Sequence, residues 1–159
     1  MSDHDGALES RLAELGETLP PSRPAAGLYA PAVISGNILY ISGSGDREGL
    51  SLGRKGKLGR DLGLEEGRAS ARGAALEALR IAKDSLGGLD RIRRILRLTG
   101  YIDADPEFER HPEVLDGASS LFLDLFGTER GGHARSAIGV SSLPFGLPVE
   151  IDLVLEIEP

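Results

Sequence analysis

The last stretch of the chain, HARSAIGVSSLPFGLPVEIDLVLEIEP from His133 to Pro159, decides the fold. It contains two runs rich in β-branched and other apolar residues, about 135–142 and 149–158, and both are predicted to be strands. Between them LPFGLP, residues 143–148, supplies the glycine and the prolines of a connection. The chain is therefore expected to close with two strands, paired as a hairpin.

Two charged residues mark these strands: Arg135 precedes the apolar part of the first, and Glu150 opens the second. In a hairpin Arg135 lies at the end away from the connection and Glu150 lies near it, so the two need not be adjacent within one subunit. Isolated strand-end charges are most often solvated. An arginine fork nevertheless suits a carboxylate ligand, and a glutamate suits the activation of water. Periodicity leaves both interpretations open.

Upstream, apolar periodicity predicts the other elements. The first is a helix with Leu8, Leu12 and Leu15 on one face, followed by a hairpin that turns at 35–37. A glycine-rich loop over 43–59 comes next, with room for short edge strands. After it the pattern predicts a helix within 61–88, a strand over 92–102, a helix over 113–126 and a loop over 127–134. On the strand 92–102, alternation places Leu96, Leu98 and Ile102 on one face and Ile95, Thr99 and Tyr101 on the other.

This order predicts an α+β fold with a mostly antiparallel, mixed sheet, two helices packed on one face, and an additional N-terminal helix. A length of 159 residues suggests one domain. Residues 1–28 are expected to form the N-terminal helix and a proline-rich connector, too short to fold alone. Residues 29–159 are expected to form the single domain.

Composition excludes several kinds of function. A net charge of −7 argues against binding nucleic acid, and the arginines of 91–97 are better explained as a solvated strand face. The absence of cysteine excludes disulfides, thiolate metal sites and cysteine nucleophiles, and fits a cytoplasmic protein. No apolar run is long enough for a membrane span, and the N-terminus lacks the pattern of a secretory signal.

Local motifs exclude further chemistry. The glycine-rich loop lacks the third glycine of a dinucleotide-binding fingerprint, and no Walker motif or nucleophile elbow occurs. The three histidines are far apart in the sequence, so no metal site is expected.

Three segments resemble one known family. LYAPAVISGNILYISG, DGASSLFLDLFG and HARSAIGVSSLPFGLPVEIDLVLEI are similar, in that order along the chain, to motifs of the RidA/YjgF (endoribonuclease L-PSP) family. The segment DGASSLFLDLFG and the N-terminal extension resemble a subgroup with an Asn-Gly-Ala-Ser stretch. The resemblance implies a chorismate-mutase-like fold and a homotrimer with ligand clefts between subunits, where Arg135 and Glu150 could meet.

The resemblance also implies roles for single residues. Arg135 would clamp a substrate carboxylate and Glu150 would position the attacking water. The cleft would be lined by Tyr29, Ser42, Gly43, Ala137 and Ser119. Many family members have cysteine where this chain has Ala137, and Asp116 replaces the subgroup asparagine, while Ser119 lies nearest the asparagine of the wider family.

The function implied is an enamine or imine deaminase, a hydrolase that converts reactive 2-imino acids to 2-keto acids and ammonia without a cofactor or metal. The implied partners are a small 2-imino or 2-keto carboxylate ligand and two further copies of the chain, with no membrane and no nucleic acid. Two alternatives stay open. One is a non-catalytic trimer that binds small carboxylates as a sensor or regulator. The other is an endoribonuclease or translation inhibitor of the L-PSP type.

Overall fold

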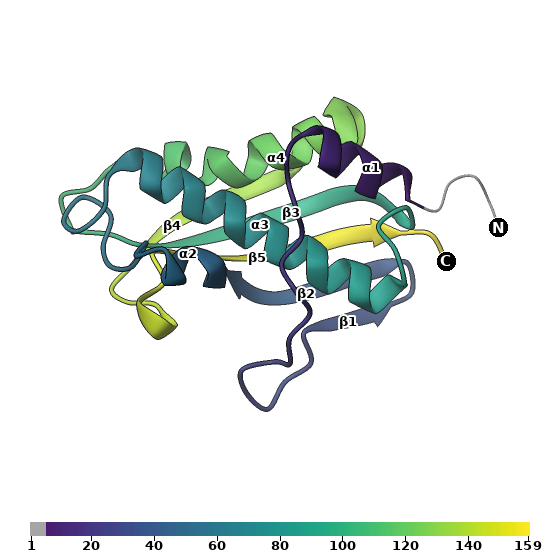
Figure 1. Cartoon of the computed structure of the whole chain (residues 1–159), viewed down its shortest axis with the longest axis horizontal. Helices are drawn as coiled ribbons and strands as arrows, with labels where there is room; N and C mark the ends of the chain where they lie inside the picture. Colours follow the sequence, from purple (N-terminus) through teal and green to yellow (C-terminus); the bar gives the residue numbers. More distant parts are fainter. Residues whose placement is uncertain (1–5) are drawn as a thin grey trace.

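The computed structural model describes residues 6–159 and shows one five-stranded sheet with helices on one face (Figure 1). The strands are β1 (Ala32–Ser35), β2 (Ile38–Gly45), β3 (Ile92–Asp103), β4 (Ala134–Val140) and β5 (Val149–Ile157), in the spatial order β1-β2-β5-β3-β4. Only the β3–β4 pair is parallel, and the other pairs are antiparallel. The predicted α+β fold with a mixed sheet is confirmed. The first five residues of the expected 1–28 segment lie outside the described part.

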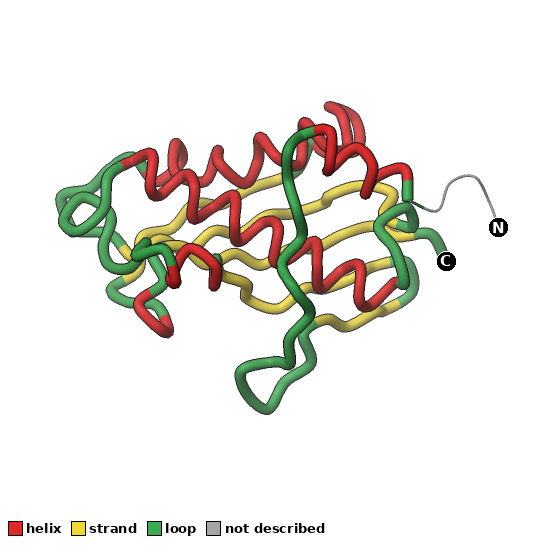
Figure 2. Tube along the Cα trace, in the orientation of Figure 1, coloured by secondary structure: helices red, strands yellow, loops and turns green. Residues whose placement is uncertain are grey.

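Two long helices cover the sheet (Figure 2). The helices are α1 (Ala7–Glu14), α2 (Arg47–Ser51), α3 (Leu64–Leu86) and α4 (His111–Gly131), followed by the 3₁₀ turn η1 (Pro144–Gly146). Helix α3 faces the sheet with alanines that are completely buried: Ala71, Ala74, Ala75, Ala78 and Ala82. Because alanine is small, the helix axis lies close to the strands, and larger residues from β3, β5 and α4 fill the core around it.

Helices α3 and α4 also approach each other closely at one glycine. A Cβ atom placed on Gly117 would lie 2.1 Å from the backbone oxygen of Arg68, so no larger residue fits. Helix α4 is longer than the predicted 113–126, because it continues past Gly127 to Gly131. Gly127 has φ 76°, a left-handed conformation that glycine adopts without strain, and it marks a kink.

Three sequence-based expectations are wrong. Strands β4 and β5 do not form a hairpin: β4 lies parallel to β3, and β5 lies between β2 and β3. The loop 43–59 contains the short helix α2 and no edge strand, because Asp46 caps that helix by accepting a hydrogen bond from the Gly49 amide.

The third error concerns β3, where register shifts follow Ile92 and Ile95. Each shift moves the alternation by one residue, so Ile95 joins Leu98 and Ile102 in the core, while Leu96 is only half-buried. The hairpin turn predicted at 35–37 is confirmed between β1 and β2.

Candidate functional site

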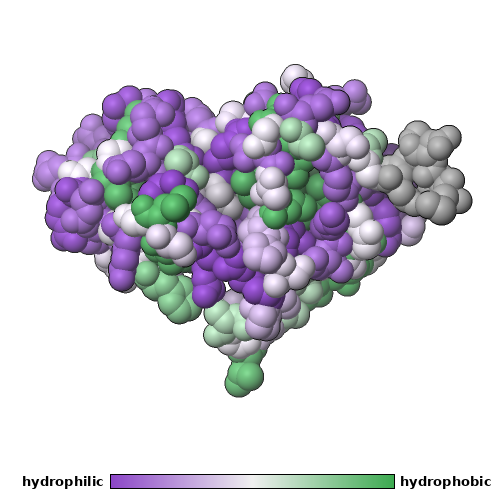
Figure 3. Space-filling model, in the orientation of Figure 1, coloured by the Kyte–Doolittle hydropathy of each residue, from purple (hydrophilic) through white to green (hydrophobic). Residues whose placement is uncertain are grey.

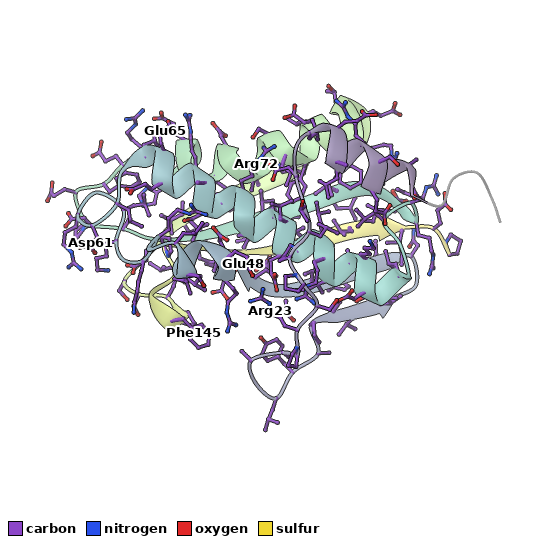
Figure 4. The ribbon with its side chains drawn as sticks, in the orientation of Figure 1. Arg23, Glu48, Asp61, Glu65, Arg72 and Phe145 are labelled. Atoms are coloured by element: carbon purple, nitrogen blue, oxygen red, sulfur yellow. The ribbon has the colours of Figure 1, made fainter. Side chains whose placement is uncertain are left out.

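A cavity of about 440 Å³ lies at the end of β2, between that strand, helix α3 and the connector from α1. The walls include Arg23, Tyr29, Ser42, Gly43, Arg47, Glu77, Arg80, Phe145 and Glu150. Figure 4 shows Arg23 and Phe145 on the same rim of the molecule, one on the connector and the other at η1. The cavity therefore joins four of the predicted site residues, Tyr29, Ser42, Gly43 and Glu150, with others that the sequence did not indicate.

A bulge in β2 places Gly43 against Glu150. The pairing of β2 with β5 shifts register between Ile41 and Ser44. A Cβ atom on Gly43 would lie 2.5 Å from Oε1 of Glu150, so only glycine leaves room for the carboxylate. Bulges commonly redirect a side chain at a functional site. Here the bulge lets the Glu150 carboxylate lie directly over the β2 backbone.

Glu150 is half-buried and electrostatically uncompensated. Burial raises the pKa of its carboxyl group, and the nearby negative charge of Asp152 raises it further. Within residues 6–159 the carboxylate has no ion pair or hydrogen bond to offset that burial. A carboxylate with a raised pKa is a stronger base than an ordinary glutamate, and it is free to hold a water molecule.

Tyr29 and Ser42 form the connector side of the cavity. The Ser42 hydroxyl donates a 2.7 Å hydrogen bond to the Ala30 carbonyl, which ties the connector to β2. The Tyr29 side chain is about half exposed, and its hydroxyl accepts a 3.4 Å hydrogen bond from the Ala26 amide. The proline-rich connector thus forms a wall of the site. Figure 3 shows apolar atoms at the tip of this connector, which protrudes beyond the sheet and carries the fully exposed Leu28.

Arg135 lies elsewhere, on the edge strand β4. Its Nη1 atom donates to Oδ1 of Asp116 at 2.6 Å and to the Ser119 hydroxyl at 3.1 Å, and its Nη2 atom donates to the Pro112 carbonyl at 3.3 Å. Ser119 also pairs with the imidazole of His133 at 2.9 Å. Asp116 is therefore the ion-pair partner of Arg135.

The sheet order explains why Arg135 and Glu150 do not meet within one chain. Strand β3 separates β4 from β5. Arg135 pairs in register with the buried Leu98 and contacts α4, so it lies on the helix side of the sheet. Glu150 pairs with Tyr101, on the other face. Of the remaining predicted residues, Ala137 packs against the core and Ser119 joins the Arg135 cluster, and neither lines the cavity.

A buried ion pair on α3 forms another wall of the cavity. Glu77 and Arg80 are each only 6% exposed, and Arg80 Nη2 donates to Glu77 Oε1 at 2.6 Å. The other terminal nitrogen of Arg80 bonds Asp84 at 2.9 Å. In the sequence these residues have the spacing of an ordinary exposed ion-pair row on a helix. Their burial depends on the connector, whose course the local pattern did not reveal.

Within residues 6–159 no group of three or more histidine, aspartate or glutamate side chains is arranged to hold a metal ion. A helix with the length and apolar character of a membrane span is also absent from the described part of the chain.

Comparison with known proteins places this geometry in a family. Residues 9–155 match the sequence model of the YjgF/chorismate mutase-like endoribonuclease family. Protein TCP17 of Trypanosoma cruzi is 38% identical over 152 residues, which cover 96% of this chain and 95% of that protein. The crystal structure of Atu1372, a protein of unknown function from Agrobacterium tumefaciens, is 39% identical with a TM-score of 0.88, covering 98% of this chain and 95% of the other.

The fold extends to more distant proteins. The structure of RidA from the Antarctic bacterium Psychrobacter sp. PAMC 21119 is 23% identical, with a TM-score of 0.58, and the match covers 86% of this chain and 94% of that one. At this identity the likeness concerns the fold alone. With a family match along most of its length, and relatives that align from end to end, this chain belongs to the YjgF/chorismate mutase-like endoribonuclease family.

Proposed function

We propose that this protein is an imine deaminase, which hydrolyses 2-imino acids to 2-keto acids and ammonia in clefts between the subunits of a homotrimer. Water adds to the carbon of the C=N bond and gives a carbinolamine. The C–N bond then breaks, the nitrogen leaves as ammonia with the proton it has gained, and the C=O bond forms. No electrons are transferred, so the reaction needs no redox cofactor.

The observation that carries this proposal is the Glu150 carboxylate. It is half-buried at a cavity wall, has a raised pKa and has room to hold a water molecule because Gly43 has no side chain. A base of this kind accepts a proton from the attacking water and can return it to the departing nitrogen. Imines are intrinsically reactive, so orientation of the water and the substrate supplies much of the required acceleration.

The second requirement is a cation for the substrate carboxylate, and we assign it to Arg135 of a neighbouring subunit. Arg135 lies on β4, an edge strand with one free side. Its Nη1 atom bonds Asp116 and Ser119, but its Nη2 atom bonds only a carbonyl, so part of the guanidinium fork remains for a ligand. The homotrimer is part of the proposal, because one chain alone holds Arg135 and Glu150 apart.

A coupled assay tests the proposal. A threonine dehydratase generates the imine of 2-ketobutyrate, and the protein should accelerate the appearance of the keto acid. Glu150→Gln and Arg135→Ala should abolish this acceleration. Arg60→Gln serves as the control, because Arg60 is exposed and lies outside the cavity. The proposal fails if wild type gives no acceleration, or if Arg135→Ala accelerates as well as wild type.

The family name includes endoribonuclease, so RNA cleavage is the alternative to test in parallel. RNA binding needs a positive surface, whereas this chain has a net charge of −7. Cleavage of RNA that persists in Arg135→Ala after repeated purification, without imine hydrolysis, would favour that alternative.

A further inference from the structure

Three arginines line the cavity, and two of them are already neutralised. Arg80 is held between Glu77 and Asp84. Arg23 pairs with Glu48 at 2.7 Å and lies 3.9 Å from Glu77 (Figure 4). These two cations are bound to carboxylates of their own chain and are not free to bind an anionic ligand.

Arg47 is different. Among residues 6–159 its guanidinium takes part in no ion pair and no hydrogen bond, although it is half-buried in the cavity wall. Its Cζ atom lies 4.8 Å from the centre of the Phe145 ring, the geometry of a cation–π contact. A cation–π contact is not a hydrogen bond, so the N–H groups of the guanidinium remain available for a planar acceptor such as a carboxylate.

The backbone at both residues is fixed. Asp46 caps α2 by accepting from the Gly49 amide at 2.8 Å and from Arg54 at 3.0 Å, which anchors the first turn that carries Arg47. Phe145 is the one non-glycine residue in the described part of the chain with positive φ, at 61°. Such a conformation is costly for an aromatic residue and is typical of functional sites. It holds a ring that is 56% exposed at the cavity rim.

We infer that Arg47, held in a cation–π contact with Phe145, is a second anion-binding residue of this cavity, and that the preferred substrate is a 2-imino acid with a second carboxylate on its side chain. This inference rests on the proposed function, in which Arg135 takes the carboxylate next to the imine. A remaining unpaired cation in the same cavity then matches a second anionic group. Among the standard amino acids, aspartate and glutamate supply imines of this class.

Substrate pairs that differ only in that carboxylate test the inference. An amino acid oxidase generates the imines of glutamate and of norvaline, whose side chain ends in a methyl group instead of the carboxylate. Semicarbazide traps the imine, so the loss of semicarbazone measures hydrolysis. Wild type should prefer the glutamate imine by about tenfold in kcat/KM, the usual worth of a charge-assisted hydrogen bond.

Three variants test which residues produce the preference for the glutamate imine. Arg47→Gln should lower kcat/KM for the glutamate imine about tenfold and change that for the norvaline imine less than about twofold. Phe145→Ala should reduce the preference in part, and Arg60→Gln should retain it. Equal kcat/KM values of wild type for the two imines, or a preference that survives in Arg47→Gln, would overturn the inference and leave the proposed function intact.

Direct measurements of ligand binding distinguish failure of this inference from failure of the proposed function. Calorimetry with 2-oxoglutarate and 2-oxopentanoate needs no turnover and uses the wild-type protein. About tenfold tighter binding of 2-oxoglutarate, lost in Arg47→Gln, supports the anion site even if neither imine is hydrolysed. Equal affinities of wild type for the two keto acids contradict it, whatever the activity.

Discussion

The substitution Gly43→Ala tests whether the position of the Glu150 carboxylate matters for catalysis. The new Cβ atom would lie 2.5 Å from Oε1 of Glu150, about 0.9 Å closer than ordinary contact begins. The carboxylate must therefore move by nearly 1 Å, and a misplacement of this size costs on the order of 10²-fold in rate. We expect kcat/KM for imine hydrolysis to fall by about that factor, which corresponds to roughly 2.7 kcal/mol of transition-state stabilisation.

The same substitution should leave stability nearly unchanged. Displacing the end of one flexible side chain costs about 0.5–1.5 kcal/mol. Replacing glycine by alanine recovers about 0.4–1 kcal/mol through the lower entropy of the unfolded chain. Thermal denaturation and the coupled imine assay check both quantities, with Gly88→Ala as the control because a Cβ atom there meets nothing within 4 Å. A Gly43→Ala protein that folds and keeps more than a third of wild-type kcat/KM would refute the reasoning.

Three further substitutions give separable results. Burial raises the pKa of Glu150 in the folded protein above its value in the unfolded chain. The free energy of unfolding is therefore not reduced by this group below the unfolded pKa, and it decreases as the pH rises through the folded pKa. Glu150→Gln should therefore unfold at a higher temperature than wild type at neutral pH, and the difference should vanish below about pH 4. Gly117→Ala forces a Cβ atom to within 2.1 Å of the Arg68 backbone oxygen, so urea denaturation should show a loss of about 3 kcal/mol. Asp116→Asn removes the ion-pair partner of Arg135 and should lower KM for 2-imino acids by up to about fivefold, and a higher KM would instead show that Asp116 positions the arginine.

Apolar periodicity was sufficient to predict most of the helices and strands of the fold. The alanine stripe of α3 and the alternation in β5 each have one side toward the core, so their burial could be read directly from spacing. The hairpin turn at 35–37 followed from Gly36, which has φ 59°. These elements are determined by residues close together in the sequence.

The errors arose where distant residues decide the outcome. Strand β4 pairs in parallel with β3 because helix α4 carries the chain across the sheet, and local periodicity does not encode strand order. Helix α2 depends on Asp46, which also bonds Arg54. The same limit applies to the site. Glu150 and Gly43 were predicted as site residues from the resemblance, whereas Arg47 and Phe145 become neighbours only through tertiary structure.

Because β3 separates Arg135 from Glu150 within one chain, the proposed site depends on the assembly of subunits. Co-assembly of two inactive variants tests this dependence. If each cleft combines Glu150 of one subunit with Arg135 of the next, then Arg135→Ala and Glu150→Gln proteins are each inactive alone. Random co-assembly gives each cleft a one-in-four chance of having both residues intact, so about one quarter of wild-type activity should return.

The matched control is co-assembly of the Arg135→Ala protein with an Arg135→Ala, Glu150→Gln double variant, in which no cleft has both residues intact. Two affinity tags isolate the mixed assemblies before the assay. Each isolated mixed trimer has one intact cleft of its three, so about one third of wild-type activity is expected after this selection. Such activity cannot arise if both residues act within a single chain, because neither variant chain then has a complete site. Mixed assemblies without restored activity would contradict the shared cleft, and the carboxylate of the substrate would then need a cation from the same chain as Glu150, for which Arg47 is the free candidate in the cavity wall.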